Sequence, residues 1–457
     1  MAYFRDVALV PARFVSDNPA LTTAISRTVS RTSRKNSLSL ARSRSSVNFP
    51  TDPVVNYLSN SNAANNDDDD TASPSKYDIG WRRVVCHFSP SWFATTMGTG
   101  IVSLILICIP FKAHWLYWLS VCFFCLNALL FTLALSISTL RYTLHPEIWT
   151  VMIADSTDSL FLGCLPVGFA TLVEAWIFLC CPYWGHWSVY VAAAAWMLDC
   201  VLAVFVTLSL PFLLMSQSHQ HSLDRVTAAQ LLPIAATVVA AAAGSEVAEV
   251  LQPQDPQWAL GTLLASYIMW GIAVPLALTV LVIYYQRLAL HKLPPREVIV
   301  SSFLPLSSLG MGGYAILSLG KVSRLVFPQV KFFHNLAVAG DIVYITGVFL
   351  ALIMWGFGLC WLVFALAGMW HLRPFPFNMG WWGFTFPLGA YSISTMAIGV
   401  EMPSLFFRVL GTIFGVAVVV LWVVVAAGTA RGAYQGHLFY APCLKNLSKH
   451  HDTDGDG

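Results

Sequence analysis

Long apolar runs, separated by short polar segments, fill the chain from about residue 88 to residue 428. Many of these runs reach the roughly 18 residues that a helix needs to cross a lipid bilayer. The pattern predicts ten membrane-spanning helices, at residues 88–108, 115–139, 156–179, 188–214, 227–244, 257–285, 298–319, 339–369, 378–399 and 403–428. The alanine-rich segment 227–244 is the least typical span because acidic residues flank it, but without it the number of spans would be odd.

Polar segments lie on both sides of this apolar region. Residues 1–80 contain the stretches RTVSRTSRKNSLSLARSRSS and NNDDDD, a composition typical of disordered chains. No apolar segment follows these basic residues, so we predict a tail rather than a signal peptide. The chain therefore divides into a basic and polar tail at 1–80, a transmembrane domain at 81–440 and a short polar tail at 441–457.

Composition excludes a soluble globular protein. Hydrophobic residues make up 57% of the chain and charged residues 11%, whereas soluble domains carry about 25% charged residues. Most of the ten cysteines lie inside apolar runs, so neither a disulfide framework nor a zinc site is indicated. Lysine and arginine are concentrated in the N-terminal tail and in the loops on its side of the membrane, which predicts that both termini are cytoplasmic.

The odd-numbered spans share a proline followed by small or hydroxyl-bearing residues, as in FSPSWFATTMGTG and FTFPLGAYSISTMAIG. These prolines are Pro90, Pro166, Pro233, Pro305 and Pro387. Among the even-numbered spans, only the sixth has a proline near its middle. Proline opens the hydrogen-bond ladder of a helix, and a membrane tolerates the opening only where protein or water satisfies the freed groups.

We therefore predict an all-α polytopic fold of ten helices in five helical hairpins. The kinked odd helices form an inner ring around a central pore, and the even helices pack outside them. A plainer explanation is that proline and glycine are simply more frequent in membrane helices.

Hydroxyl side chains on the odd spans predict a weakly polar lining for such a pore. The candidate lining residues are Thr95, Thr96, Thr99, Thr171, Thr237, Ser307, Ser308, Ser392 and Thr395. A polar but uncharged lining suits an ion that is held weakly enough to leave again. Each hydroxyl could instead bond back to its own helix.

Charged residues within the spans are candidates for coupling or gating, because each is costly in a bilayer. Asp158 either caps the third span or has a gating or proton-linked role. Asp199 lies in the fourth span, and either it or Asp341 is a candidate partner for Arg408 in the tenth. Three glutamates are interpreted as residues of the membrane surface, namely Glu174, Glu246 and Glu249.

Enzyme motifs are absent from the sequence. It contains no HExxH, GxSxG or P-loop and no GxGxxG in a strand context, so we expect no catalytic residues, no cofactor and no metal site. A membrane-embedded sensor or scaffold that transports nothing, with the basic tail as its working part, is the alternative class of function.

Two motifs, HFSPSWFATTMGTGIVSLIL in the first span and WWGFTFPLGAYSISTM in the ninth, resemble the tellurite-resistance/dicarboxylate transporter family. With LHPEIW and DSTDSLFLGCLPVGFATL, they are most similar to its fungal sulfite efflux pump branch. The resemblance implies a homotrimer in the plasma membrane and a phenylalanine of the ninth helix that blocks the pore. That phenylalanine corresponds to Phe386, directly before Pro387, with Phe384 as the rival position.

The same resemblance implies export of sulfite or hydrogen sulfite, with small inorganic or organic anions and the lipid bilayer as partners and no nucleic acid. The alternative within the family is a permease for C4-dicarboxylates such as malate.

Overall fold

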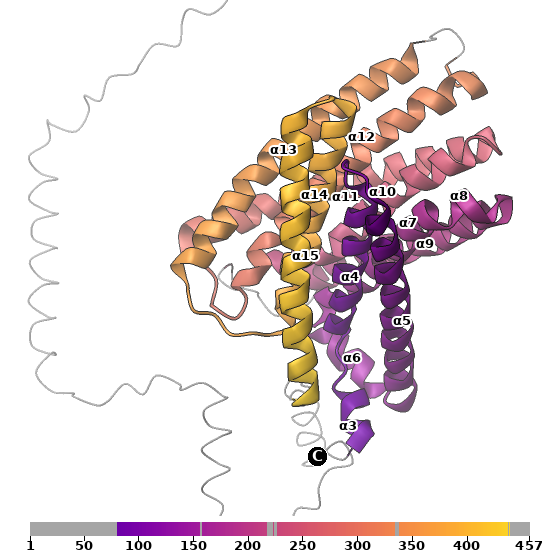
Figure 1. Cartoon of the computed structure of the whole chain (residues 1–457). Coiled ribbons are helices and arrows are strands. Elements are labelled where there is room, and N and C mark those ends of the chain that lie inside the picture. Colours follow the sequence, from indigo (N-terminus) through magenta and orange to yellow (C-terminus); the bar gives the residue numbers. More distant parts are fainter. Residues whose placement is uncertain are drawn as a thin grey trace, which may run out of the picture. The chain divides into compact units, whose positions relative to one another are not determined.

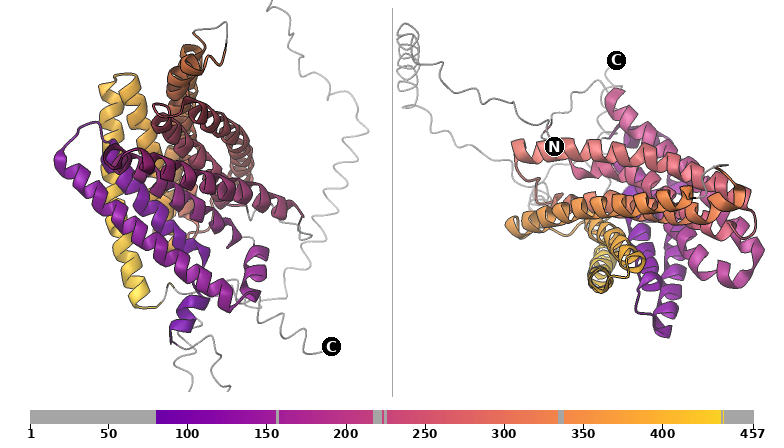
Figure 2. Two further views of the ribbon diagram at one scale, coloured as in Figure 1. Left: turned by 90° about the vertical axis from the view of Figure 1, so that its right-hand side faces the viewer. Right: turned by 90° about the horizontal axis from the view of Figure 1, so that it is seen from above.

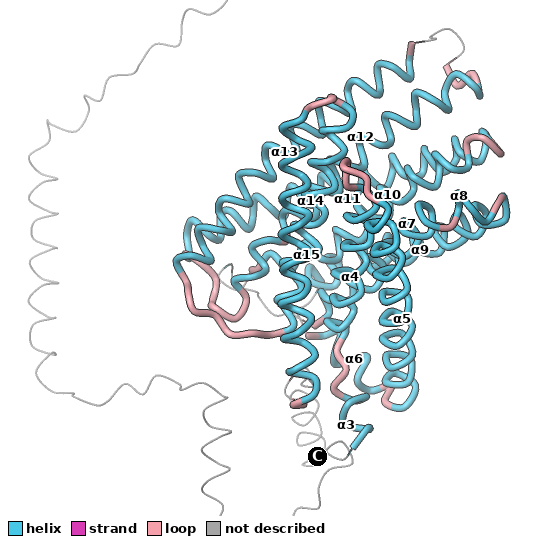
Figure 3. Tube along the Cα trace, in the orientation of Figure 1, coloured by secondary structure: helices cyan, strands magenta, loops and turns pink. Residues whose placement is uncertain are grey.

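The computed structural model describes residues 80–155, 158–216, 226–333 and 338–436, together with Leu223 and Leu438. Within these residues the chain is helical and contains no strand (Figure 3). The chain divides into two compact units, Met1–Ser73 and Pro74–Gly457, and the described residues all belong to the second. The tails predicted at 1–80 and 441–457 lie outside the described residues, except for Gly80.

Thirteen α-helices lie in the described part of the chain. They are α3 (Gly80–Cys86), α4 (Phe93–Cys108), α5 (His114–Leu144), α6 (Glu147–Ala154), α7 (Cys164–Leu179), α8 (Cys181–Trp184), α9 (His186–Ser216), α10 (Leu231–Leu251), α11 (Pro256–His291), α12 (Pro305–Val330), α13 (Ala339–His371), α14 (Trp382–Glu401) and α15 (Leu405–Tyr434). Short 3-10 helices precede five of them: η1 (Pro90–Trp92), η2 (Ser159–Gly163), η4 (Ala228–Gln230), η5 (Ile299–Phe303) and η6 (Met379–Trp381).

Nine helical segments in the described part of the chain are long and apolar enough to cross a membrane. They correspond to every predicted span except the ninth, residues 378–399. That segment forms α14, whose hydroxyl-bearing and glycine residues keep it out of the apolar class although it is helical over 20 residues.

Burial alternates along the chain. The most apolar 18-residue stretches of α4, α7, α10 and α12 are mostly buried, and that of α10 is completely buried. In α5 and α15, by contrast, only 22% of the corresponding stretch is buried. The alanine-rich α10 packs against α7, α9, α11 and α12. Small side chains let these neighbours approach closely, which explains why this alanine-rich helix is the most enclosed of the predicted spans.

The five helices that follow the 3-10 helices contact one another in a closed cycle, α4–α7–α10–α12–α14–α4. Each also packs against the next long helix of the chain, in the pairs α4·α5, α7·α9, α10·α11, α12·α13 and α14·α15. Figures 1 and 2 show α4 beside α5 and α14 beside α15. The 3-10 helices repeat the same order of contacts, η1–η2–η4–η5–η6–η1.

Four of the five prolines of the odd spans lie near helix starts rather than in the middle of helices. Pro90 and Pro305 are the first residues of η1 and α12, and Pro166 and Pro233 are the third residues of α7 and α10. In a first turn the missing N–H has no partner within the helix to lose, so proline fits there without cost. Pro387 differs from these four because it lies inside α14.

Candidate functional site

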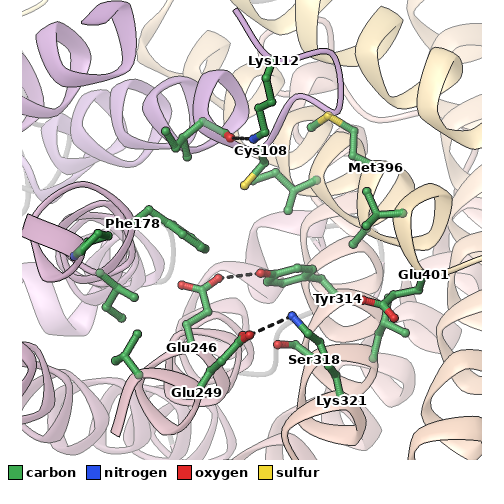
Figure 4. A pocket seen from close by; sticks show the side chains of 18 residues that line it. Cys108, Lys112, Phe178, Glu246, Glu249, Tyr314, Ser318, Lys321, Met396 and Glu401 are labelled. Atoms are coloured by element: carbon green, nitrogen blue, oxygen red, sulfur yellow. Dashed lines mark hydrogen bonds and ion pairs between the residues drawn. The ribbon is translucent and has the colours of Figure 1, made fainter. Parts of the chain in front are cut away.

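A cavity of about 500 Å³ opens between the buried helices, and we call it the five-helix cavity. It is lined by the C-terminal parts of α4, α7, α10 and α14 and the middle of α12, together with Lys112 and Pro182 (Figure 4). The lining residues of the helices are Ile107, Cys108, Ile177, Phe178, Glu246, Glu249, Val250, Tyr314, Leu317, Ser318, Lys321, Ile393, Met396, Ala397, Val400 and Glu401. All five helices of the closed cycle therefore meet at one space.

Two polar contacts join α10 to α12 across this cavity. The Tyr314 hydroxyl donates to Oε1 of Glu246 at 2.7 Å, and Nζ of Lys321 lies 2.9 Å from Oε1 of Glu249 (Figure 4). Lys112 donates to the backbone carbonyl of Ile107. The Lys321–Glu249 pair is half-exposed, so it contributes little to stability and leaves charge at the cavity wall.

Phe386 and Phe384 lie on opposite sides of α14. Ile393 and Ala397 line the five-helix cavity, and Phe386 precedes them by seven and eleven residues, which places it on the same helix face. Phe384 instead packs its ring edge-on against Phe303, with 5.1 Å between ring centroids, and also contacts Trp381. Both side chains are buried.

Five of the nine candidate lining hydroxyls bond to a neighbouring helix. Thr99 accepts from Trp422 of α15, Thr171 from Asn127 of α5 and Thr395 from Trp355 of α13; Thr237 bonds Thr207 of α9, and Ser392 donates to the Gly411 carbonyl of α15. These hydrogen bonds connect the buried helices α4, α7, α10 and α14 to the more exposed helices α5, α9, α13 and α15. The role of these five residues as pore lining stays a prediction.

The remaining hydroxyls are also buried. Thr95, Thr96 and Ser307 each donate to the backbone carbonyl three residues earlier, a local bond that Ser and Thr in membrane helices commonly make. Ser308 has no hydrogen-bond partner among the described residues.

Replacing Thr171 by valine should destabilise the protein by about 1–3 kcal/mol, because the buried Asn127 amide would lose its acceptor. Thermal unfolding in detergent measures the change. Thr132→Val is the matched control, since the exposed Thr132 donates only to a carbonyl of its own helix, and its effect should be close to zero. Equal melting temperatures for the two variants would contradict the prediction.

The three candidate charges occupy different surroundings. Asp158 precedes η2 and is buried, and its backbone N–H donates to Oδ1 of Asp155 at 2.9 Å. Arg408 lies in the first turn of α15 and donates to the Gly399 carbonyl at 3.0 Å. Asp199 lies in α9, fully buried.

Arg408 does not pair with Asp341, because Oδ1 of Asp341 lies 2.8 Å from Nε of Arg324. Asp199 has no hydrogen-bond partner on either oxygen among the described residues, so it does not pair with Arg408 either.

Sequence reasoning missed the charged and polar groups of the five-helix cavity. It ended the fifth span at residue 244, before Glu246, whereas α10 continues to Leu251 and the Glu246 side chain is buried. Glu174 is likewise buried within α7. A usable signal was the single tyrosine, Tyr314, in the otherwise small and apolar run before Lys321, because a buried phenol requires a polar partner.

Comparison with known proteins identifies the family. Residues 87–430 match the family described as voltage-dependent anion channel, SLAC1. The chain is 46% identical over 365 residues to the sulfite efflux pump SSU1 of Arthroderma otae, an alignment that covers 80% of this chain and 93% of that protein.

More distant relatives align over a similar length. Identity is 28% over 366 residues to the sulfite efflux pump SSU1 of Candida albicans, covering 74% of this chain and 73% of the relative. It is 24% over 364 residues to the malic acid transport protein of Schizosaccharomyces pombe, covering 78% and 80%. The family match spans well over half of the sequence, and the chain therefore belongs to the SLAC1 family of anion channels and transporters.

Proposed function

We propose that this protein exports sulfite or hydrogen sulfite across the plasma membrane, through a central pathway between α4, α7, α10, α12 and α14. The observation that carries the proposal is the closed cycle of these five buried helices around one cavity. The similarity to fungal proteins named sulfite efflux pump supports sulfite as the cargo. Three copies, as the family resemblance implies, form the proposed assembly.

The proposed topology has ten spans, with α14 as the additional one. A helix enclosed by others does not face lipid, so it can carry hydroxyls and glycine without being strongly apolar. Most of α14 is buried, and it contacts α4, α12 and α15. With an even number of spans and the basic tail inside, both termini are cytoplasmic.

Helix orientation supports entry of an anion at the end formed by the 3-10 helices. Five helix N-termini meet there, because η1, η2, η4, η5 and η6 contact one another in a cycle. Helix N-termini expose N–H groups and carry partial positive charge. The five-helix cavity at the other end is then the exit, and an inside-negative potential drives each exported charge by about 2.3 kcal/mol per 100 mV.

We place the gate of this pathway at Phe386. Ala170, Val239 and Ser307 lie seven positions before Ile177 of α7, Glu246 of α10 and Tyr314 of α12, which line the cavity, and all three are small and buried. In α14, the residue seven positions before the cavity-lining Ile393 is Phe386, which directly precedes Pro387. It is the one large side chain among these four positions. Hydrophobic constrictions of this kind close pores by excluding water.

Cavity charge favours a small anion over a dicarboxylate. Lys112 and Lys321 line the five-helix cavity together with three glutamates, and Lys321 is paired with Glu249. A molecule with two carboxylates requires more uncompensated positive charge than these residues offer. The similarity to malic acid transport proteins keeps a malate permease as the second candidate.

Expression in cells that are sensitive to sulfite and lack an exporter tests the function. We expect the full chain to restore sulfite tolerance and to increase sulfite release into the medium. The absence of both, with the protein present at the cell surface, would refute the proposal. Removing residues 1–80 should leave release intact, whereas a sensor or scaffold working through that tail would lose its output.

A further inference from the structure

Three carboxylic acids are buried in helices that are long and apolar enough to cross a membrane. Glu174 of α7, Asp199 of α9 and Glu246 of α10 expose 1%, 0% and 4% of their surface. Their helices pack against one another in all three combinations. Glu174 lies one turn before Ile177 and Phe178, which line the five-helix cavity, and Glu246 lines it directly.

Hydrogen bonding leaves most of these carboxyl oxygens without a partner. Oε1 of Glu174, Oε2 of Glu246 and both oxygens of Asp199 have none among the described residues. One contact is present, from the Tyr314 hydroxyl to the other oxygen of Glu246 at 2.7 Å. A buried carboxylate anion needs several donors or a cation, and these three groups do not have them.

The surrounding groups do not supply a compensating charge. Glu174 lies within electrostatic range of both Asp199 and Glu246, so ionised forms repel one another. Cys108 of α4 and Tyr314 of α12 face the cluster, and Cys200 is the neighbour of Asp199; all three side chains are neutral in their usual forms.

The two nearby cations have other partners. Lys321 attracts ionised Glu246, but it pairs with Glu249, whose charge has the opposite effect on Glu246, and Lys112 donates to a backbone carbonyl. Asn127, the polar residue of α5 that packs against α7, bonds Thr171. A proton is therefore the cation that best neutralises the cluster.

We propose that Glu174, Asp199 and Glu246 form an intramembrane proton-binding site that controls anion passage through the five-helix cavity. The inference deepens the proposed anion export and rests on it. A proton taken from the outer solution binds a carboxylate oxygen of Glu246 and makes the cavity wall neutral. When the proton leaves, the wall gains a negative charge that repels the exported anion, so export slows as outer pH rises.

Glutamine substitutions test the site, because glutamine has the shape of a protonated glutamate. Sulfite release from vesicles containing the full chain is measured at outer pH values from about 5 to about 8, spanning the range over which enclosed carboxyl groups titrate. Sulfite exchanges a proton itself near neutral pH, so each variant rate is divided by the parent rate at the same pH. Glu401→Gln is the matched control, since that carboxylate also lines the cavity but accepts from Tyr344.

The ratio for Glu246→Gln is expected to rise by about tenfold or more across this range, a change that one uncompensated charge at close range readily produces. Glu174→Gln should move the ratio in the same direction, and Glu401→Gln should keep it flat. Flat ratios for both Glu246→Gln and Glu174→Gln would overturn the inference. Parent vesicles that release no sulfite at any pH would refute the proposed function instead.

Thermal unfolding tests the proton-binding site independently of transport. Each of these carboxyl groups becomes a buried charge without a partner when its proton leaves, so the folded protein should lose stability as pH rises. The melting temperature of the parent should therefore fall between about pH 5 and pH 8 by more than that of a Glu174→Gln/Glu246→Gln double variant. Parallel curves for the two proteins would overturn the proton-binding site.

Discussion

Replacing Phe386 by alanine is expected to raise sulfite release from reconstituted vesicles by about tenfold or more. The ring lies on the α14 face that continues into the five-helix cavity, where the corresponding residues of three other helices are small. Removing it takes away the largest steric barrier of the proposed pathway. A barrier lowered by about 1.4 kcal/mol already corresponds to a tenfold change in rate.

Phe384→Ala is the matched control for this prediction. Its ring packs against Phe303 and Trp381, away from the cavity face, so its loss should cost about 3–5 kcal/mol of stability without faster release. Faster release from Phe384→Ala together with an unchanged rate for Phe386→Ala would move the gate to Phe384. Flux assays and melting temperatures on the same preparations separate the two effects.

Replacing Gly310 by alanine should destabilise the protein by about 1–3 kcal/mol, because α12 and α14 touch there backbone to backbone. A Cβ at Gly310 would lie 2.8 Å from the backbone nitrogen of Tyr391 and 2.9 Å from the carbonyl carbon of Ala390. Backbone atoms cannot rotate away as a flexible side chain can, so the two helices must separate. The melting temperature in detergent measures the loss.

Gly356→Ala serves as the control for the same substitution in a membrane helix. A Cβ there meets nothing within 4 Å, and alanine favours helix over glycine. Its melting temperature should equal or slightly exceed that of the parent. A Gly310→Ala protein as stable as Gly356→Ala would contradict the prediction, because it would show that the α12–α14 contact accommodates a methyl group.

Hydropathy located the helices well but misjudged where several end. The predicted spans 227–244 and 298–319 stop before acidic and basic residues, whereas α10 and α12 continue to Leu251 and Val330. Those charges are accommodated by contacts between the two helices, Lys321 with Glu249 and Tyr314 with Glu246. A local hydropathy window cannot register partners that lie about 70 residues away in the sequence.

The proline pattern marked the correct helices for a different physical reason. Sequence alone fixes helix boundaries only to within a few residues, so Pro166 and Pro233 looked interior to their spans. Both lie in the first α-helical turn after a 3-10 helix. Four of the five repeated prolines therefore mark the point where a buried helix begins, and Pro387 lies inside α14. Parity along the chain still separated the buried helices from the exposed ones.

The direction of each side chain around its helix could not be read from the sequence. A hydroxyl on a buried helix can face either the central space or an outer helix, and both choices leave it in an apolar run. Thr99 and Thr395 bond tryptophans of α15 and α13, which depends on how α4 and α14 are rotated. The same rotation distinguishes Phe386 from Phe384, since two residues of a helix that are two apart point in different directions.

Anion-selective flux in vesicles containing the purified full chain tests the central claim most directly. Vesicles loaded with sulfite, malate, nitrate or chloride are compared under an applied potential that is negative on the side of the anion, with protein-free vesicles as the background. We expect sulfite to leave in a protein-dependent manner, faster as the potential grows, and faster than malate. Release of malate without release of sulfite, or no protein-dependent release of any anion, would contradict the account.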